Sequence, residues 1–168
     1  MFDKFGEFNS SEEINKAADE LFNKADMDSI RKLAQENGLD MEDAEDFIEG
    51  IIDELTTPLA AAMGKLKVES EELKLKGILE DWVDEIKSMC ADNIELAKAV
   101  RKKGKDLAGY IAKTAESGYE NRVVVDKQIV EKAKKIKSVI GNHEFAIGIP
   151  DKKTRRDIVT TYYLGQEG

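Results

Sequence analysis

His143 and Cys90 are the only histidine and the only cysteine in this chain of 168 residues. His143 stands beside Glu144 in a stretch that we expect to be a loop, where a lone histidine usually faces solvent. Cys90 shares the helical spacing of Trp82 and Ile86, which is typical of a core thiol. The zinc-binding patterns with paired cysteines, His-x-Glu or His-Glu-x-x-His are absent. The sequence therefore predicts no catalytic histidine or thiol and no zinc site.

Carboxylates are the other abundant group that could do chemistry. Asp26 and Asp28 begin the Asp-x-Asp pattern of a calcium loop, which needs glycine at its sixth position and glutamate at its twelfth. Arg31 and Asn37 occupy those two positions. The chain also lacks a Gly-x-x-x-x-Gly-Lys phosphate loop, and no two carboxylates stand out as an acid–base pair. We therefore expect neither an enzyme nor a bound metal or cofactor.

The net charge of −9 is spread unevenly along the chain. Residues 1–60 carry −12, residues 61–100 carry −3 and residues 101–168 carry +6. Such asymmetry indicates charged partners rather than a particular fold. One dense acidic stretch is formed by Asp40, Glu42, Asp43, Glu45, Asp46, Glu49, Asp53 and Glu54. It is either a solvated face or a face that mimics nucleic acid and occupies a basic groove of a partner, where charge complementarity speeds association.

Residues 30–47 have a spacing close to that of a helix-turn-helix motif. A second helix that reads DNA needs Arg, Lys, Asn or Gln to meet phosphates and base edges. Residues 40–46 read Asp-Met-Glu-Asp-Ala-Glu-Asp, without a single basic residue. Because these carboxylates repel phosphate, we expect a plain helical hairpin.

The C-terminal part carries the opposite charge. Arg101, Lys102, Lys103 and Lys105 cluster at the end of an expected helix, where cations suit the helix dipole. A second group opens the last expected helix, where cations are poorly placed for the dipole, and two tyrosines follow it: Lys152, Lys153, Arg155, Arg156, Tyr162 and Tyr163. Arg with Tyr is typical of protein-binding hot spots and of single-strand binders. We expect this basic tail, or the acidic residues 40–49, to bind a partner.

Helical spacing dominates the chain and predicts an all-α, multi-helix bundle. The longest stripe runs from 70 to 91 and is expected to be the central helix, preceded by a helix over 58–67. Later helices are expected over 93–103, 105–117, 127–139 and 151–163. Residues 122–125 and 145–149 are candidates for a minor two-stranded β element. We expect an acidic helical subdomain over 1–56 and a helical core with a basic tail over 57–168.

Several features bear on location. A single cysteine excludes an intramolecular disulfide, the N-terminal sequence lacks an apolar leader, and no stretch reaches the ~18–20 apolar residues of a membrane span. We therefore expect a cytoplasmic protein without a membrane partner.

Residues 92–140 resemble the C-terminal part of the PcfK-like family, in the strings AKAVRKKGKDLAGYIAKTAES and ENRVVVDKQIVEKAKKI. The matching positions are a helix-entering step, a β-branched stretch and an Asp-capped helix: Lys105, Asp106, Leu107, Gly109, Val123, Val124, Val125, Asp126 and Val130. The chain departs from the family where a Tyr-Phe pair usually closes the Asp-capped helix, because Lys135 and Ile136 stand there. An aromatic pair follows only at Tyr162 and Tyr163, after an insertion.

This family occurs on conjugative elements and phages of Firmicutes, and it includes inhibitors of the RNA-guided nuclease of type II CRISPR systems. The resemblance therefore implies an anti-CRISPR protein that binds a bacterial defence nuclease or its guide-bound complex in the host cytoplasm. The alternative is an accessory factor of a conjugative element that binds nucleic acid through the basic tail. The resemblance supplies no catalytic residues, and a structural or assembly protein also stays open.

Overall fold

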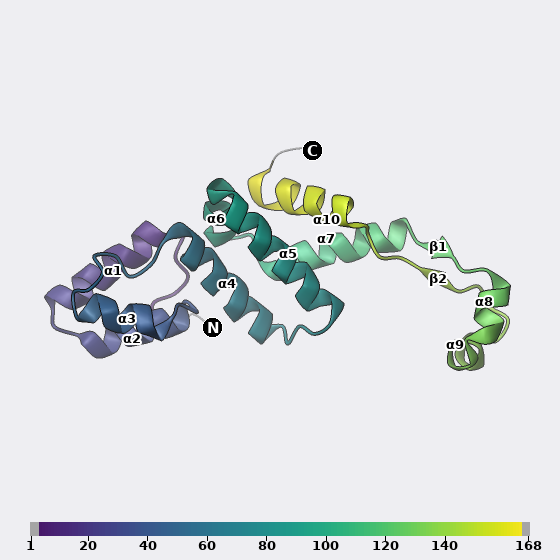
Figure 1. Ribbon diagram of the computed structural model, residues 1–168, viewed down its shortest axis with the longest axis horizontal. Helices are drawn as coiled ribbons and strands as arrows, with labels where there is room; N and C mark the ends of the chain where they lie inside the picture. The colour runs from purple at the N-terminus through teal and green to yellow at the C-terminus, as the bar shows by residue number, and fades with distance from the viewer. Residues whose placement is uncertain (1–3, 166–168) are drawn as a thin grey trace.

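The computed structural model describes residues 4–165. It confirms the predicted all-α fold class with a minor two-stranded β element. Figure 1 shows an elongated molecule with α1–α3 at one end and β1, β2, α8 and α9 at the other. No helix within the described range is long and apolar enough to cross a bilayer. The elements are α1 (Ser11–Asn23), α2 (Met27–Glu36), α3 (Met41–Ile48), α4 (Pro58–Glu72), α5 (Ile78–Asp92), α6 (Ile94–Arg101), α7 (Leu107–Glu120), β1 (Val123–Val124), α8 (Lys127–Lys132), α9 (Lys134–Ile140), β2 (Ala146–Ile147), α10 (Lys152–Val159) and the π-helical turn η1 (Thr160–Leu164).

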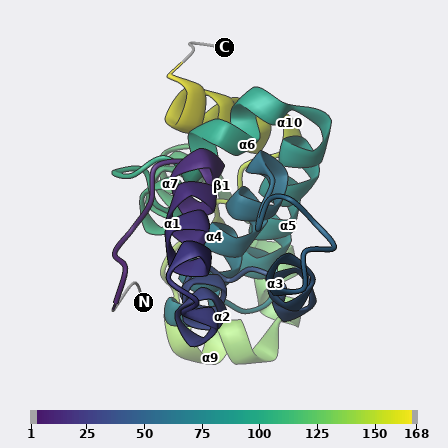
Figure 2. The ribbon, with the colours of Figure 1, turned by 90° about the vertical axis from the view of Figure 1, so that its left-hand side faces the viewer.

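The N-terminal lobe consists of α1, α2 and α3, which face the viewer in Figure 2. The side chains of Ser10, Asp26 and Asp40 accept hydrogen bonds from backbone amides of the first turns and fix where these helices begin. The lobe has its own apolar core, formed by Ile14, Ala18, Ile30, Leu33, Ala34, Leu39, Ala44, Phe47, Leu55 and Ala61. The hairpin expected over 30–47 is thus present as α2 and α3.

The helical body consists of α4–α7, α10 and η1, with α4 packed against α5, α6 and α7. Its core includes Leu66, Trp82, Val83, Ile86, Cys90, Leu96, Val100, Leu107, Tyr110, Val159 and Tyr163. Thr57, next to the subdomain boundary expected after residue 56, caps α4. Helix α4 belongs to both cores, because Ala61 packs in the lobe and Ala62, one residue later, packs in the body.

The helix expected over 70–91 is divided in the structure. Helix α4 continues to Glu72, beyond the expected end at 67, and α5 begins only at Ile78. Between them the backbone has positive φ at Lys74 (52°) and Gly77 (59°), which ends one helix and redirects the chain into the next. Leu75 and Ile78 keep a helical spacing across this break, so the apolar pattern alone does not reveal it.

Two later helices also differ from expectation. The helix expected over 127–139 is divided at Ala133 (φ −86°, ψ 71°) into α8 and α9. The helix expected to end at Gly118 continues to Glu120. Gly118 is not a helix terminator here, because its missing side chain lets the backbone of Gly148 approach.

Lobe and body are joined by a buried polar junction around α4. The ammonium of Lys65 donates to the carbonyls of Lys102 (2.7 Å) and Lys105 (3.1 Å) and forms an ion pair with Glu7 at 2.9 Å. The guanidinium of Arg101 donates to Asn37 Oδ1 at 2.5 Å, and burial lowers the pKa of Arg101 to about 10. Because these groups lie on segments far apart in sequence, the junction fixes the lobe against the body.

Candidate interaction surfaces

Residues 121–149 leave the helical body as one unit, which we call the projecting arm (Figure 1). β1 and β2 form its stem, and α8 and α9 form its tip. Val123 lies opposite Ile147 in the antiparallel register. The amide of Val125 donates to the carbonyl of Phe145 at 2.8 Å and extends the pairing toward the tip. The two segments that the sequence marked as extended are therefore partners, as expected.

The root of the arm is fixed by small residues and one stacked cation. A Cβ on Gly118 would lie 2.5 Å from the carbonyl oxygen of Gly148 and 3.0 Å from Pro150, so α7 and the returning strand are in close contact. Arg122 donates to the carbonyl of Tyr119 at 2.8 Å, and its guanidinium lies 4.2 Å from the centre of the Tyr119 ring. Tyr119 stays largely exposed in spite of this stacking.

The tip is a short helical hairpin with little core of its own. The carboxylate of Asp126 accepts a hydrogen bond from Gln128 N at 2.8 Å and so starts α8. Lys137 of α9 forms an ion pair with Glu131 of α8 at 2.5 Å. Within 121–149, all of which the structure describes, Val130 is the only buried residue. The tip therefore depends on local contacts rather than on a packed core.

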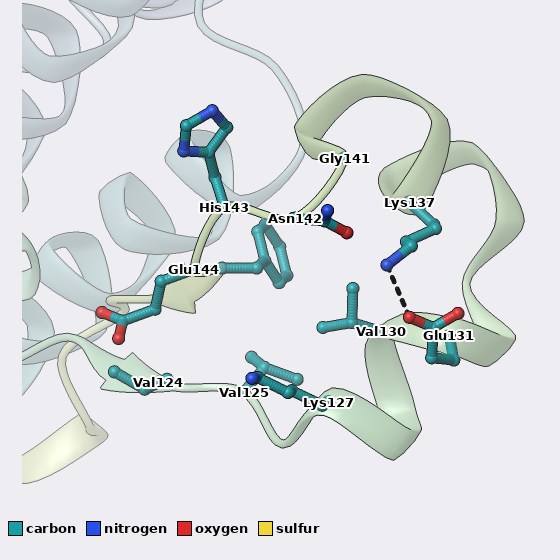
Figure 3. Close-up of a pocket in the computed structure, with 11 residues that line it drawn as sticks. Val124, Val125, Lys127, Val130, Glu131, Lys137, Gly141, Asn142, His143 and Glu144 are labelled. Atoms are coloured by element: carbon teal, nitrogen blue, oxygen red, sulfur yellow. Dashed lines mark hydrogen bonds and ion pairs between the residues drawn. The ribbon is translucent and has the colours of Figure 1, made fainter.

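Figure 3 shows a pocket of about 560 Å³ between the stem and the tip of the arm. Val124, Val125 and Val130 give it apolar walls, and Lys127 and His143 add polar groups to its lining. His143 and Glu144 extend in different directions in Figure 3, so these sequence neighbours do not form a pair. The polar part of the lining also includes Glu144 and the ion-paired Lys137 and Glu131.

The arm exposes an unusual amount of apolar surface. Of the thirteen large apolar side chains that are exposed among the described residues, seven lie between 119 and 149: Tyr119, Val123, Val124, Ile129, Val139, Ile147 and Ile149. Val139 is 85% exposed and Val123 71%. Single exposed apolar residues are ordinary, but a group of them in one segment is a candidate interaction surface. The arm itself, residues 121–149, has six basic and three acidic residues, hence a net charge of +3.

The acidic residues expected to bind a partner lie on and around α3, at the end of the molecule opposite the arm. Asp40, Glu42 and Glu49 are exposed, whereas Asp43, Glu45 and Asp46 are half-buried. The carboxylate of Glu45 forms a bidentate ion pair with Arg31 of α2, in which Nε donates to Oε1 at 2.6 Å and Nη2 donates to Oε2 at 2.8 Å. This hydrogen bonding lowers the pKa of Glu45 and raises that of Arg31. Part of the acidic stretch therefore has a structural partner within the lobe.

The basic residues of α10 differ in their contacts within the protein and in their exposure. Arg155 donates to Glu85 of α5 at 2.8 Å and to the carbonyl of Pro150 at 2.8 Å, so it anchors α10 to the body. Lys153 pairs with Asp157 at 3.5 Å, and Lys152 is exposed. Arg156 is half-buried. Among these four cations, Lys152 and Lys153 are the most accessible to a partner.

The two tyrosines of η1 face the protein. Tyr163 is 4% exposed and packs beside Tyr110 in the body core, which corrects the expectation that it contacts a partner. Burial strongly raises its pKa. The hydroxyl of Tyr162 accepts a hydrogen bond from Asp106 N at 3.2 Å, where it closes the start of α7. Both tyrosines lie in the π-helical turn that follows α10.

The groups considered for chemistry are separated in space. Cys90 is buried in the body, where desolvation raises its pKa to about 12, and His143 is exposed on the arm. Among residues 4–165, no group of three or more His, Cys, Asp or Glu side chains is arranged to hold a metal ion. Comparison with family models, with curated proteins and with solved structures finds no match to this chain.

The exposed apolar surface of the arm was not expected from the sequence. The β-branched stretch and the Asp-capped helix were recognised as elements, but no binding role was assigned to their apolar residues. One available signal was the composition of 121–149, where six basic residues are interspersed among the apolar ones.

Proposed function

We propose that this protein binds and inhibits the RNA-guided nuclease of a bacterial CRISPR system, without chemistry of its own. One structural observation carries the binding role: the projecting arm holds six large apolar side chains that are exposed to water. Water-exposed groups of this kind are stabilised when a partner covers them.

The choice of partner rests on the resemblance of residues 92–140 to the PcfK-like family, which also suggests a phage or mobile element as source and a bacterial cytoplasm as location. Charged faces of opposite sign at the two ends of the molecule suit a nucleoprotein partner, whose surface presents both signs.

The test is a cleavage assay with purified type II effectors loaded with guide RNA. We expect excess protein to slow target cleavage at least tenfold and to form a complex that survives gel filtration. When binding is measured at several salt concentrations, we expect it to weaken as ionic strength rises, because screening reduces the attraction between charged faces. Unchanged cleavage together with no complex, across a panel of effectors, would exclude this function.

A second candidate is an accessory factor of conjugation that binds nucleic acid. The net charge of +3 on the arm favours it, because lysine and arginine side chains can meet phosphates. Mobility shifts with single- and double-stranded DNA at decreasing salt test this candidate, because phosphate binding strengthens as salt falls. No shift at the lowest salt excludes it.

A further inference from the structure

Resting on the proposed function, we infer that the projecting arm is the docking element and that it fits an apolar protein surface bordered by carboxylates. This assignment names the face of the molecule and the chemistry of the surface it meets. The acidic stretch on α3 lies at the opposite end of the molecule and is separate from this docking element.

The stem presents apolar side chains on both faces. Val123 and Ile147 are opposite each other in the register and are 71% and 50% exposed, so they form one exposed pair. Val124 belongs to the opposite face, because side chains alternate along a strand, and it is exposed as well. An isolated two-stranded ribbon is marginally stable in water, and contact with a partner supplies the packing that it lacks.

The tip continues this surface and adds positive charge. Ile129 on α8 and Val139 on α9 are exposed apolar side chains. Lys132, Lys134 and Lys135 are exposed beside them in sequence. Apolar contacts in the middle and cations around them are complementary to an apolar patch with Asp and Glu at its rim.

Nucleic acid fits this surface less well. Single-strand binders present aromatic rings on which bases stack. Tyr119 is the one exposed large aromatic side chain between 119 and 149, and the guanidinium of Arg122 already lies over its ring. Phosphates would meet the lysines but leave the valines and isoleucines exposed to water. A second arm is also a poor partner, because two arms of net charge +3 repel each other.

The test compares arm variants with matched variants on the lobe. One arm variant combines Val123→Thr with Ile147→Thr, which keeps β-branched residues in the stem but removes apolar surface. A second is Val139→Asp, which places a carboxylate against the inferred acidic rim of the partner. Ile51→Thr is the apolar control, since Ile51 is 65% exposed on the lobe. Lys134→Glu with Lys135→Glu is matched by Lys16→Glu with Lys24→Glu, which changes the net charge equally at exposed positions of the lobe.

The readout is the dissociation constant for the effector protein, measured with and without guide RNA, after circular dichroism shows that each variant is folded. We expect at least a tenfold weaker complex for each arm variant and less than a twofold change for both controls. Equal binding by arm variants and wild type would overturn this inference and leave the proposed function standing. No binding by wild type would overturn both.

Two further outcomes assign the arm to another occupant and would also overturn the inference. In one, arm variants weaken only binding to free oligonucleotides. In the other, light scattering shows that the wild type is a dimer and the arm variants are monomers, so that the arm contacts the acidic lobe of a second copy.

Discussion

Gly118 and Gly148 meet backbone to backbone at the root of the projecting arm, where a Cβ on Gly118 would lie 2.5 Å from the carbonyl oxygen of Gly148. Replacing a helical glycine by alanine normally stabilises a helix by about 1 kcal/mol. Here we expect Gly118→Ala to lower the free energy of unfolding by ~1–3 kcal/mol, because the strand must move away. Urea denaturation measures the difference.

The control for this change is Glu116→Ala, an exposed position of the same helix, for which we expect an effect within about 0.5 kcal/mol. If Gly118→Ala were as stable as the wild type, the close contact at the root would not constrain the arm.

Asn37 supports a buried guanidinium across the junction of lobe and body. Its side-chain oxygen accepts a hydrogen bond from Arg101, and its amide donates to the carbonyl of Leu33. We expect Asn37→Ala to cost ~1.5–3 kcal/mol, because a hydrogen bond to a charged, desolvated group is lost. Thermal or urea unfolding measures this, with Gln35→Ala on the exposed side of the same helix as control. Equal effects of the two variants would argue against a structural role for the junction.

Local signals in the sequence were sufficient for much of the fold. Asp126 was expected to cap a helix and does so, and the extended segments around Val123 and Ala146 are paired as expected. These features depend on residues close in sequence, or on β-branched side chains in short runs. The central stripe over 70–91 shows the limit of such signals. A left-handed turn at Lys74 breaks the helix, and lysine carries no local preference for that conformation.

The predicted binding residues depended on long-range contacts that a sequence does not display. Arg155 has a basic side chain typical of binding surfaces, yet it pairs with Glu85, 70 residues away. Tyr163 looked like a hot-spot residue and is instead a core residue. Conversely, Val139 was expected at the end of the helix over 127–139 and given no binding role, yet on the arm it is 85% exposed. Composition indicates which residues can bind, whereas packing decides which of them are available.

Cys90 is a probe of the body core, because it is the only thiol of the chain. With a pKa of about 12, roughly one thiol in ten thousand is ionised at pH 8 in the folded state. We expect a thiol reagent at pH 8 to label the native protein at least ~1,000-fold more slowly than the urea-unfolded chain. Rapid, complete labelling of the native protein would show that the helices around Cys90 open readily.

The same thiol links stability to pH. The unfolded chain releases this proton near pH 9, the ordinary value for a thiol, whereas the folded protein holds it until about pH 12. Ionisation therefore favours unfolding, and stability should fall as the pH rises through this window. Cys90→Ala removes the titrating group, so its unfolding free energy should depend less steeply on pH between 9 and 12. Parallel pH profiles for the two proteins would contradict this assignment.

The projecting arm should open more easily than the helical body. Val130 is the one buried residue between 121 and 149, whereas α4 and α6 pack closely through Leu66 and Val100. Local opening costs least where few apolar contacts are lost. We expect amide hydrogens of the arm to exchange at least ~100-fold faster than those of α4 and α6. Added effector should slow exchange in the arm and leave α1–α3 unchanged, if the arm is the docking element. Slowing confined to α3 would instead assign the contact to the acidic stretch, because protection appears where a partner removes the backbone from water.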